Sequence, residues 1–292
     1  MDEEKVLLAG KIAEAALQQG KPLIKEGKSI LEVTKKVEEK IYSMGGKLGF
    51  PVNISRNHVA AHNVALLKDT TTFEDGDVVK LDVGVHIDGW IADNALTVSI
   101  GDKHKDLVNA SRNALNSAIK ILKPGIQVRE IGRVIQETIT RAGFSPIKNL
   151  SGHLIERYVV HAGITIPNYD NKDPRILEEG MLIAIEPFAT TGEGIIMEGK
   201  GSGIFRIDKK KPVRNLQVKK ILEYLEKEYK TLPFSMRAVN MPMVEYAFSV
   251  LEKEKIISQY PQLVERSKGL VSQAEHTILI KDKPIVTTKT DD

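Results

Sequence analysis

The sequence predicts an α+β fold with two similar halves and a helical insertion towards the C-terminal end. A pattern of helix, glycine-containing break and second helix occurs twice, and strand-like segments follow each copy. A further pair of amphipathic helical segments separates two late strand-like segments. Such runs of helices and strands favour an α+β arrangement, in which helices pack on the strands as separate layers.

The repeat aligns at an offset of 98 residues, with 16–41 placed over 114–139. Apolar residues three or four positions apart predict helices at 30–41 and 128–139. We interpret the match as a duplication, although two helix–turn–helix units can also look alike by chance. A duplicated chain would have a pseudo-two-fold axis, with a site between its halves. The identical pairs are Ala16/Ala114, Leu17/Leu115, Lys25/Lys123, Gly27/Gly125, Glu32/Glu130, Glu39/Glu137 and Ile41/Ile139.

Length and composition limit the class of protein. The 292 residues, 41% of them hydrophobic, suffice for one large domain or two ordinary ones. A net charge of only +3 argues against a protein built mainly to bind nucleic acid. The absence of cysteine excludes disulfides, thiolate nucleophiles and cysteine-ligated metals. We expect a cytoplasmic protein, because no apolar run could span a membrane and residues 1–20 predict an amphipathic helix rather than a signal peptide.

Segments rich in β-branched residues indicate where the strands lie. We expect strands within 78–100, 158–166, 181–189 and 276–280. Residues 215–257 are helical again and form the predicted insertion. The linker that leads into it, RIDKKKPVRN (206–215), is basic, and residues 206–220 together contain seven lysines and arginines. We interpret this basic segment as a solvated loop, and a nucleic-acid or ribosome contact is the alternative.

Residues 78–100 predict a β-hairpin. Alternating β-branched residues mark two strands, and Asp88-Gly89 is a strong signal for a two-residue turn between them. A two-residue turn determines the pairing of the strands, so Ile87 is expected opposite Trp90.

The same register brings two carboxylates to one face of the hairpin. Gly84 is expected opposite Asp93, which makes Asp82 and Asp93 diagonal neighbours, about 7–8 Å apart. Ionised carboxylates on a largely apolar hairpin cost several kcal/mol unless they are hydrogen-bonded, paired or bound to metal. From the hairpin alone, solvation on an exposed face explains them equally well.

Three further polar residues lie on strand-like segments or at strand ends. They are His153, Glu186 and Glu275. Each is a weak signal by itself, since a single histidine more often has a structural role. Together with Asp82 and Asp93 they provide one imidazole and four carboxylates. This oxygen-rich set could hold two divalent ions about 3.5–4 Å apart, which is hydrolase chemistry.

Five motifs in collinear order resemble the methionine aminopeptidases, and within them the type 2 group. The resemblance implies the pita-bread fold, with pseudo-two-fold α+β halves in a single catalytic domain spanning 1–292. The stretch at about 197–258 looks like the helical insertion that separates type 2 from type 1. The family's long N-terminal extension is absent, as in the short microbial and archaeal forms. The matching segments are GFPVNISRNHVAAHN (49–63), KLDVGVHIDGWIADNALTV (80–98), NLSGHLIERYVVHAGITIPN (149–168), IAIEPFATTGEG (183–194) and QAEHTILI (273–280).

The resemblance also implies roles for the polar residues. Asp82, Asp93, His153, Glu186 and Glu275 match the five ligands of two divalent ions, which could be Co, Mn, Zn or Fe. Asp93 and Glu275 look like the bridging carboxylates. Asp82 would serve one ion, and His153 with Glu186 the other. Glu186 is also the expected general base, which takes a proton from the attacking water.

Six residues match the substrate site of the family. His62 corresponds to a histidine near the substrate amide and His161 to one beside the scissile carbonyl. Both would act as uncharged or cationic donors that stabilise the tetrahedral intermediate, without binding metal. The residues expected around the methionine side chain are Phe50, Phe188, Val160 and Tyr260.

The sequence departs from the family pattern near these residues. Ser151 stands where an asparagine is expected, and Pro187 restricts Glu186 to an extended conformation. The segment 197–207 does not match closely, so no pocket residue is carried over from it. Of the remaining histidines, His58, His86 and His104 are expected at the surface, and His276 is expected to point to the face opposite Glu275.

The resemblance implies an exopeptidase that removes the initiator methionine from nascent polypeptides with a small second residue. Nascent N-termini would be its partners, with a transient ribosome contact, no membrane, no specific nucleic acid and a monomeric state. An enzyme of the same fold that acts on Xaa-Pro bonds is the close alternative, because its ligands would be similar. The contexts of His62 and His161 and the insertion favour methionine removal. A non-catalytic binding protein attached to RNA or ribosomes is a third possibility, but such proteins typically lose ligands and all five are intact here.

Overall fold

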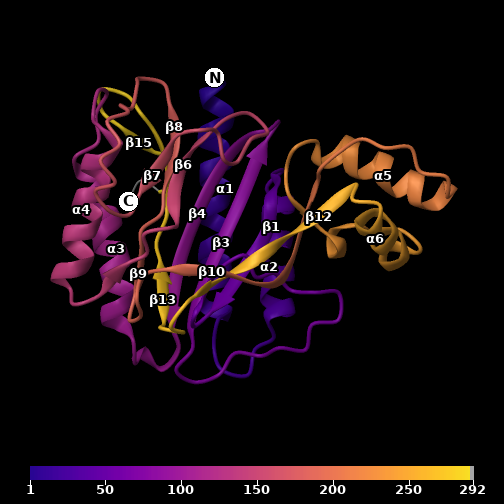
Figure 1. The fold of residues 1–292 in the computed structure, drawn as a ribbon, viewed down its shortest axis with the longest axis horizontal. Coiled ribbons are helices and arrows are strands. Elements are labelled where there is room, and N and C mark those ends of the chain that lie inside the picture. Colours follow the sequence, from indigo (N-terminus) through magenta and orange to yellow (C-terminus); the bar gives the residue numbers. More distant parts are fainter. Residues whose placement is uncertain (290–292) are drawn as a thin grey trace.

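Each half of the chain begins with two helices that pack on a sheet. The structure is a computed structural model that describes residues 1–289 (Figure 1). Helices α1 (Glu3–Gly20) and α2 (Ile30–Ser43) begin after Asp2 and Ser29, whose side chains accept hydrogen bonds from the first turn. They pack on an antiparallel sheet with the order β1-β3-β4. Its strands are β1 (Lys47–Arg56), β3 (Val78–Ile87) and β4 (Trp90–Ser99).

The second half repeats this plan. Helices α3 (Lys105–Lys120) and α4 (Val128–Arg141) pack on a sheet with the order β15-β14-β8-β6-β7, and they form the left edge of the molecule in Figure 1. The strands of this sheet are β6 (Ser151–Ile155), β7 (Thr165–Pro167), β8 (Leu182–Ile185), β14 (His276–Leu279) and β15 (Ile285–Val286). A smaller sheet consists of β5 (Ser145–Pro146), β9 (Phe188–Thr190) and β13 (Val271–Gln273). Short 3₁₀ turns lie at Lys21–Leu23, Ile100–Asp102 and Met236–Ala238.

Matched backbone contacts confirm the predicted repeat. In each half, the residue before the second helix forms a β-bridge with a later segment, and the glycine of the break donates a hydrogen bond to the same segment. The bridges are Ser29–Thr72 and Gln127–Ile176, and the glycine bonds are Gly27 N to Phe73 O (2.9 Å) and Gly125 N to Leu177 O (2.7 Å). The residues before the second helix of each half differ in number by the predicted offset of 98. The residues that they contact differ by 104. Both halves therefore share one backbone design.

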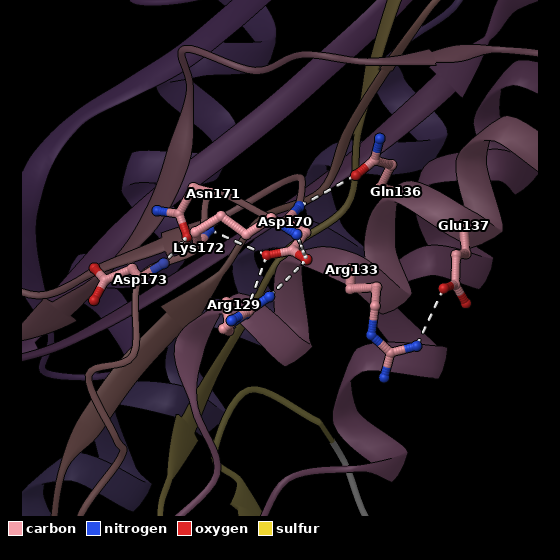
Figure 2. Close-up of polar contacts among 8 residues, drawn as sticks. All are labelled: Arg129, Arg133, Gln136, Glu137, Asp170, Asn171, Lys172 and Asp173. Atoms are coloured by element: carbon pink, nitrogen blue, oxygen red, sulfur yellow. Dashed lines mark hydrogen bonds and ion pairs between the residues drawn. The ribbon is translucent and has the colours of Figure 1, made fainter.

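A polar cluster holds the segment after β7 against α4 (Figure 2). The Asp170 carboxylate accepts bonds from Arg129 Nε and Nη2, both at 3.2 Å, and from Lys172 Nζ at 2.8 Å. These cations, Lys172 first and then Arg129, hold the pKa of Asp170 well below its usual range. The backbone N–H of Asp170 donates to Gln136 on the same helix. The start of α4 is thus covered without a side-chain cap of its own.

The predicted insertion projects to the right in Figure 1. Helices α5 (Leu216–Tyr229) and α6 (Val244–Lys253) form inside it, within the expected helical range, and share a separate apolar core. The start of the segment is not helical, because Ile196–Ile207 forms the long strand β10. This strand lies in a sheet with the order β11-β10-β12-β2. The other strands are β11 (Phe234–Ser235), β12 (Ile257–Glu265) and β2 (Val59–Ala61). Within residues 1–289, the helices are too short or too polar to cross a membrane.

Two strand predictions are wrong in detail. Residues 158–166 do not form one strand, because Tyr158 and Gly163 adopt positive φ angles of 62° and 80° and the chain turns there. Residues 181–189 form two strands, β8 and β9, separated by Glu186 and Pro187. Proline has no N–H to continue a ladder, so the strand is interrupted where Glu186 lies.

The surface position expected for His86 is also wrong. Its side chain is buried, with 4% of the residue exposed, and its Nδ1 accepts a bond from the turn residue Gly89 at 3.0 Å. Burial lowers the pKa of His86 to about 4, with a smaller contribution from Lys47. A neutral imidazole therefore serves as an acceptor that stabilises the hairpin turn.

This arrangement predicts a pH-dependent stability. Since the folded pKa of His86 lies below the unfolded value of 6.5, the unfolded state takes up the proton first as the pH falls. The contribution of neutral His86 to the free energy of unfolding is complete above pH 6.5. It decreases towards pH 4, by at most about 3 kcal/mol. Urea unfolding measures the free energy of unfolding across this pH range. As the pH falls, this free energy should decrease less in His86→Gln than in the unsubstituted protein. Equal decreases in the two proteins would contradict this assignment.

Candidate metal centre and substrate pocket

The β3–β4 hairpin has the predicted register. Ile87 pairs with Trp90 and Gly84 with Asp93, so Asp82 and Asp93 lie diagonally on one face. Gly84 also pairs with Phe50 of β1. A Cβ atom at Gly84 would lie 2.4 Å from the Phe50 ring, so glycine allows this aromatic side chain to approach the two carboxylates.

The hairpin joins the second half of the molecule beside Asp93. The N–H of Asp93 donates to Thr277 Oγ1 at 2.7 Å, and the same hydroxyl donates to Asp93 O at 2.8 Å. Two residues further along, Ala95 and Glu275 form a β-bridge. The reciprocal bonds hold β4 against β14 and bring Glu275 to the face that carries Asp82 and Asp93.

His153 and Glu186 approach from the second sheet. His153 lies in β6, and Glu186 lies at the break after β8. His153 Nε2 is 3.5 Å from Asp93 Oδ2 and 3.9 Å from Glu186 Oε1. Asp82 and Glu186 differ by 104 positions, which is the offset of the matched contacts, so they occupy equivalent places in the two halves. The structure thus brings all five predicted ligands together.

Burial dominates the electrostatics of this cluster. Asp93 and Glu275 are 4% and 2% exposed. Burial raises the pKa of Asp93 to about 7. Burial, followed by the neighbouring carboxylate charges, raises the pKa values of Asp82, Glu186 and Glu275 well above their usual range. Burial also lowers the pKa of His153 to about 4, so the imidazole is neutral at pH 7 and free to act as a ligand.

Several atoms of the cluster fit divalent cations. Within residues 1–289, Asp82 Oδ1, Asp93 Oδ1 and Glu275 Oε1 are buried and have no hydrogen-bond partner. Ligand atoms of Asp93, His153 and Glu275 lie within 4.8 Å of one another. Buried charges of one sign need counter-charges, and carboxylate and imidazole are suitable ligands for divalent metals. The donor set therefore suits metal binding.

Gln273 is a site residue that the sequence analysis missed. Its Nε2 donates to Glu275 Oε2 at 3.0 Å and lies at 3.5 Å from Asp82 Oδ2 and Glu186 Oε2. The Thr97 hydroxyl accepts from Gln273 N at 2.8 Å and donates to Gln273 O at 2.6 Å. One amide thus bridges three carboxylates. Its spacing of two residues from Glu275 was a usable signal, because alternate strand residues share a face.

An aromatic cavity of about 250 Å³ opens beside the carboxylates. The predicted residues Phe50, Phe188, Val160, Tyr260, His62 and His161 all line it. Ser151 lines it too, as expected from its place in the motif. A larger cavity of about 930 Å³ lies between residues 56–71 and the insertion, but none of the five predicted ligands lines it.

The insertion and its flanking strands supply part of the wall. Ile204 of β10, Pro233 after α5 and Leu263 of β12 line the cavity. The sequence analysis carried no pocket residue from 197–207, since that stretch matches no motif. Ile204 reaches the site because β10 pairs with β11 and β12, which are far from it in the sequence.

Both substrate histidines line the cavity, and each is held by a different neighbour. His62 has a positive φ of 58°, and its Nδ1 lies 3.2 Å from Pro261 O. Burial lowers the pKa of His62 to about 4, so it is neutral at pH 7 rather than cationic. The His161 ring lies edge-on to His153, with 4.4 Å between centroids. His161 therefore stands directly beside the carboxylate cluster.

Comparisons with known proteins agree with this site. The model of metallopeptidase family M24 matches residues 4–210. The chain belongs to metallopeptidase family M24. It is 46% identical to the methionine aminopeptidase of Pyrococcus abyssi, over 99% of this chain and 100% of that relative. The predicted enzyme class, a hydrolase among the methionine aminopeptidases of this family, is confirmed.

Solved structures confirm the predicted fold. The methionine aminopeptidase of Thermotoga maritima superposes with a TM-score of 0.72 at 25% identity, covering 98% of this chain and 96% of that one. A thermophilic Arx1 gives a TM-score of 0.85 at 15% identity, covering 99% and 91%, and this likeness concerns the fold alone. The M24 fold, with its two α+β halves, therefore describes this chain.

Asp93→Asn should abolish tight metal binding and activity while the protein stays folded. The change removes a negative charge from the centre of the cluster. The dissociation constant for the metal should therefore rise by more than the roughly 10- to 100-fold that is typical when a residue that only orients a ligand is lost. Calorimetric titration of metal-stripped protein with Mn²⁺ measures this constant. Asp75→Asn, which alters a surface ion pair with Lys103, is the control. Near-normal binding and turnover in the Asp93 variant would contradict the assignment.

Gln273→Met should weaken metal binding by roughly 10- to 100-fold, because the three carboxylates lose the amide that orients them. The same calorimetric titration measures this loss without reference to turnover. Gln262→Met is a matched control, since Gln262 is also buried but donates to Asn63 instead. If the two variants bind metal equally well, Gln273 does not orient the ligands.

Proposed function

We propose that this chain is a two-metal methionine aminopeptidase of the type 2 group, which releases the initiator methionine ahead of a small second residue. One observation carries the proposal: four carboxylates and His153 form one wall of an aromatic cavity of about 250 Å³. Removal of a single terminal residue needs an activated water beside a pocket that admits one side chain. The carboxylates and His153 would hold the ions that activate the water, directly beside such a pocket.

The five ligands would be divided between two ions. Asp93 and Glu275 would be shared, Asp82 would serve one ion, and His153 with Glu186 the other. The short distances from His153 Nε2 to Asp93 and Glu186 support this grouping. When bound, such ions lower the pKa of a water molecule and polarise a carbonyl oxygen. Co, Mn, Zn and Fe all suit the donor set, and cellular supply would select among them.

Glu186 is the proposed general base. Its raised pKa suits the acceptance of a proton, and it lies beside His153 and Asp93 at the edge of the cavity. His161 would donate a hydrogen bond to the oxygen of the scissile carbonyl as negative charge develops there.

His62 would accept a hydrogen bond from the substrate backbone. The only hydrogen that can lie between His62 Nδ1 and Pro261 O is on the nitrogen, since a carbonyl oxygen has none to give. Neutral His62 therefore carries its proton on Nδ1 and leaves Nε2 as an acceptor. This refines the expected role of His62, from a donor to an acceptor of a substrate N–H.

The cavity suits methionine. Phe50, Phe188 and Tyr260 provide aromatic walls, and Val160 and Ile204 add aliphatic ones. An unbranched, polarisable thioether adapts well to a narrow apolar slot of this kind. We propose that these residues select the first residue of the substrate.

The assignment to type 2 rests on the segment at about 197–258, which we propose is an insertion subdomain of a single catalytic domain spanning 1–292. Its helices α5 and α6 have their own apolar core, and its flanking strands line the cavity. A cytoplasmic monomer that acts on nascent N-termini is the accompanying proposal. The seven basic residues within 206–220 are all exposed and would suit a transient, salt-sensitive ribosome contact.

The decisive experiment compares Met-Ala-X with X-Pro-Y peptides, using metal-stripped protein titrated with each ion. Cleavage of Met-Ala-X should reach at least about ten times the kcat/KM of X-Pro-Y, because the pocket is built for one apolar side chain rather than for a proline ring. A preference for X-Pro-Y would favour the alternative activity on Xaa-Pro bonds. If neither peptide is cleaved with any of the ions, the result would support a non-catalytic binding protein instead.

A further inference from the structure

Tyr158 links three parts of the molecule next to the cavity. It lies in the loop between β6 and β7, two residues before Val160 and three before His161. From there it contacts the turn of the β3–β4 hairpin and the end of helix α5 in the insertion. These contacts are made from outside the cavity, where Tyr158 is not itself part of the lining.

The hairpin turn forms one side of this contact. Tyr158 N donates to Gly89 O at 2.8 Å, and Tyr158 Oη donates to Asp88 Oδ1 at 3.2 Å. A Cβ atom at Gly89 would lie 2.3 Å from the tyrosine ring, so the close approach requires glycine there. Arg157 and Lys5 also pair with Asp88, at 2.7 and 3.1 Å. The turn is thus tied firmly to this loop.

The insertion forms the other side. Lys230 Nζ lies 3.7 Å from the centre of the Tyr158 ring, which is a close cation–π contact. Thr231 Oγ1 donates to Tyr158 O. Lys230 and Thr231 follow α5 directly, and Pro233, two residues on, already lines the cavity.

Only a few residues, held by backbone hydrogen bonds, separate Tyr158 from the end of the loop beyond His161. Glu156 and Val159 exchange backbone bonds of 3.0 and 2.9 Å across a tight turn whose centre includes Tyr158. Beyond His161, Ala162 N donates to Leu154 O at 2.8 Å. Val160 and His161 therefore lie between two fixed points, Val159 and Ala162, directly after the contacts of Tyr158.

We propose that Tyr158 is a positioning residue through which the insertion sets the place of His161 beside the metal centre. The inference rests on the proposed function, since His161 matters only if the cavity is a peptidase site. It assigns the insertion a part in the reaction itself, in addition to its part in the pocket wall.

The first test measures the loop without reference to activity. Amide hydrogen exchange of residues 156–164 is compared between the unsubstituted protein and the double variant Lys230→Met with Thr231→Val. Both substitutions lie outside the loop. Exchange in the loop should accelerate by about tenfold or more in the double variant, because the loop loses its anchor to the insertion. Lys227→Met, which replaces an exposed lysine in the last turn of α5, is the matched control. Unchanged exchange in the double variant would overturn the proposal.

The second test asks whether the anchoring acts through His161. Tyr158→Ala should lower the kcat for Met-Ala-X by about 10- to 100-fold, since a shift of about 1 Å at a reacting group has an effect of that size. In a His161→Ala background the same change should lower kcat by less than about twofold. Tyr158→Phe keeps the ring over Lys230 and should retain most of the activity. Calorimetry should show unchanged metal binding in every variant.

The outcomes separate this proposal from the proposed function. Equal losses of kcat in the two backgrounds would show that Tyr158 does not act through His161, which overturns the proposal. An unsubstituted protein that cleaves no Met-Ala-X peptide would contradict the proposed function, while the exchange measurement would still report whether the insertion holds the loop. If Tyr158→Ala does not fold, Lys230→Met with Thr231→Val replaces it in the same double-mutant cycle.

Discussion

Repulsion among four buried carboxylates is the constraint on which the rest of the structure depends. Burial is the largest cause that raises the pKa of Asp93 to about 7, and the neighbouring carboxylate charges add to burial in raising the pKa of Glu275. A folded chain tolerates such a cluster only where fixed donors and cations compensate it. Gln273 supplies a donor from the protein, and bound divalent ions would supply the charge.

The duplicated fold explains how such an unfavourable cluster is assembled. Each half has its own apolar core of helices on a sheet, which provides the stability that the site itself does not. Asp82 and Glu186 occupy equivalent places in the two halves, and the cluster forms where the halves meet. The reciprocal bonds of Thr277 with Asp93 close this junction. Separate folding of either half would leave the ligand set incomplete.

The insertion completes the site in a different way. Its flanking strands β10 and β12 bring Ile204, Tyr260 and Leu263 to the cavity, and its helices pack on their own core behind them. Through Lys230 and Thr231 it also contacts the loop that carries His161. These contacts lie three residues from His161, next to the carboxylate cluster.

Local patterns in the sequence determined much of this protein. The offset of 98 predicted the repeat, and Asp88-Gly89 predicted a hairpin register that places Asp82 diagonal to Asp93, because both depend on residues close together in the chain. The family motifs predicted five ligands, which the structure brings together, and six residues that line the cavity beside them. Tertiary structure decided what depends on distant contacts. Periodicity did not reveal the burial of His86 beneath the turn or the loop at 158–164, whereas the break at Glu186 follows from the adjacent Pro187 and could be read from the sequence. The bridging of three carboxylates by Gln273 and the entry of Ile204 into the cavity depend on pairings between segments far apart in sequence, and only the folded chain brings those segments together.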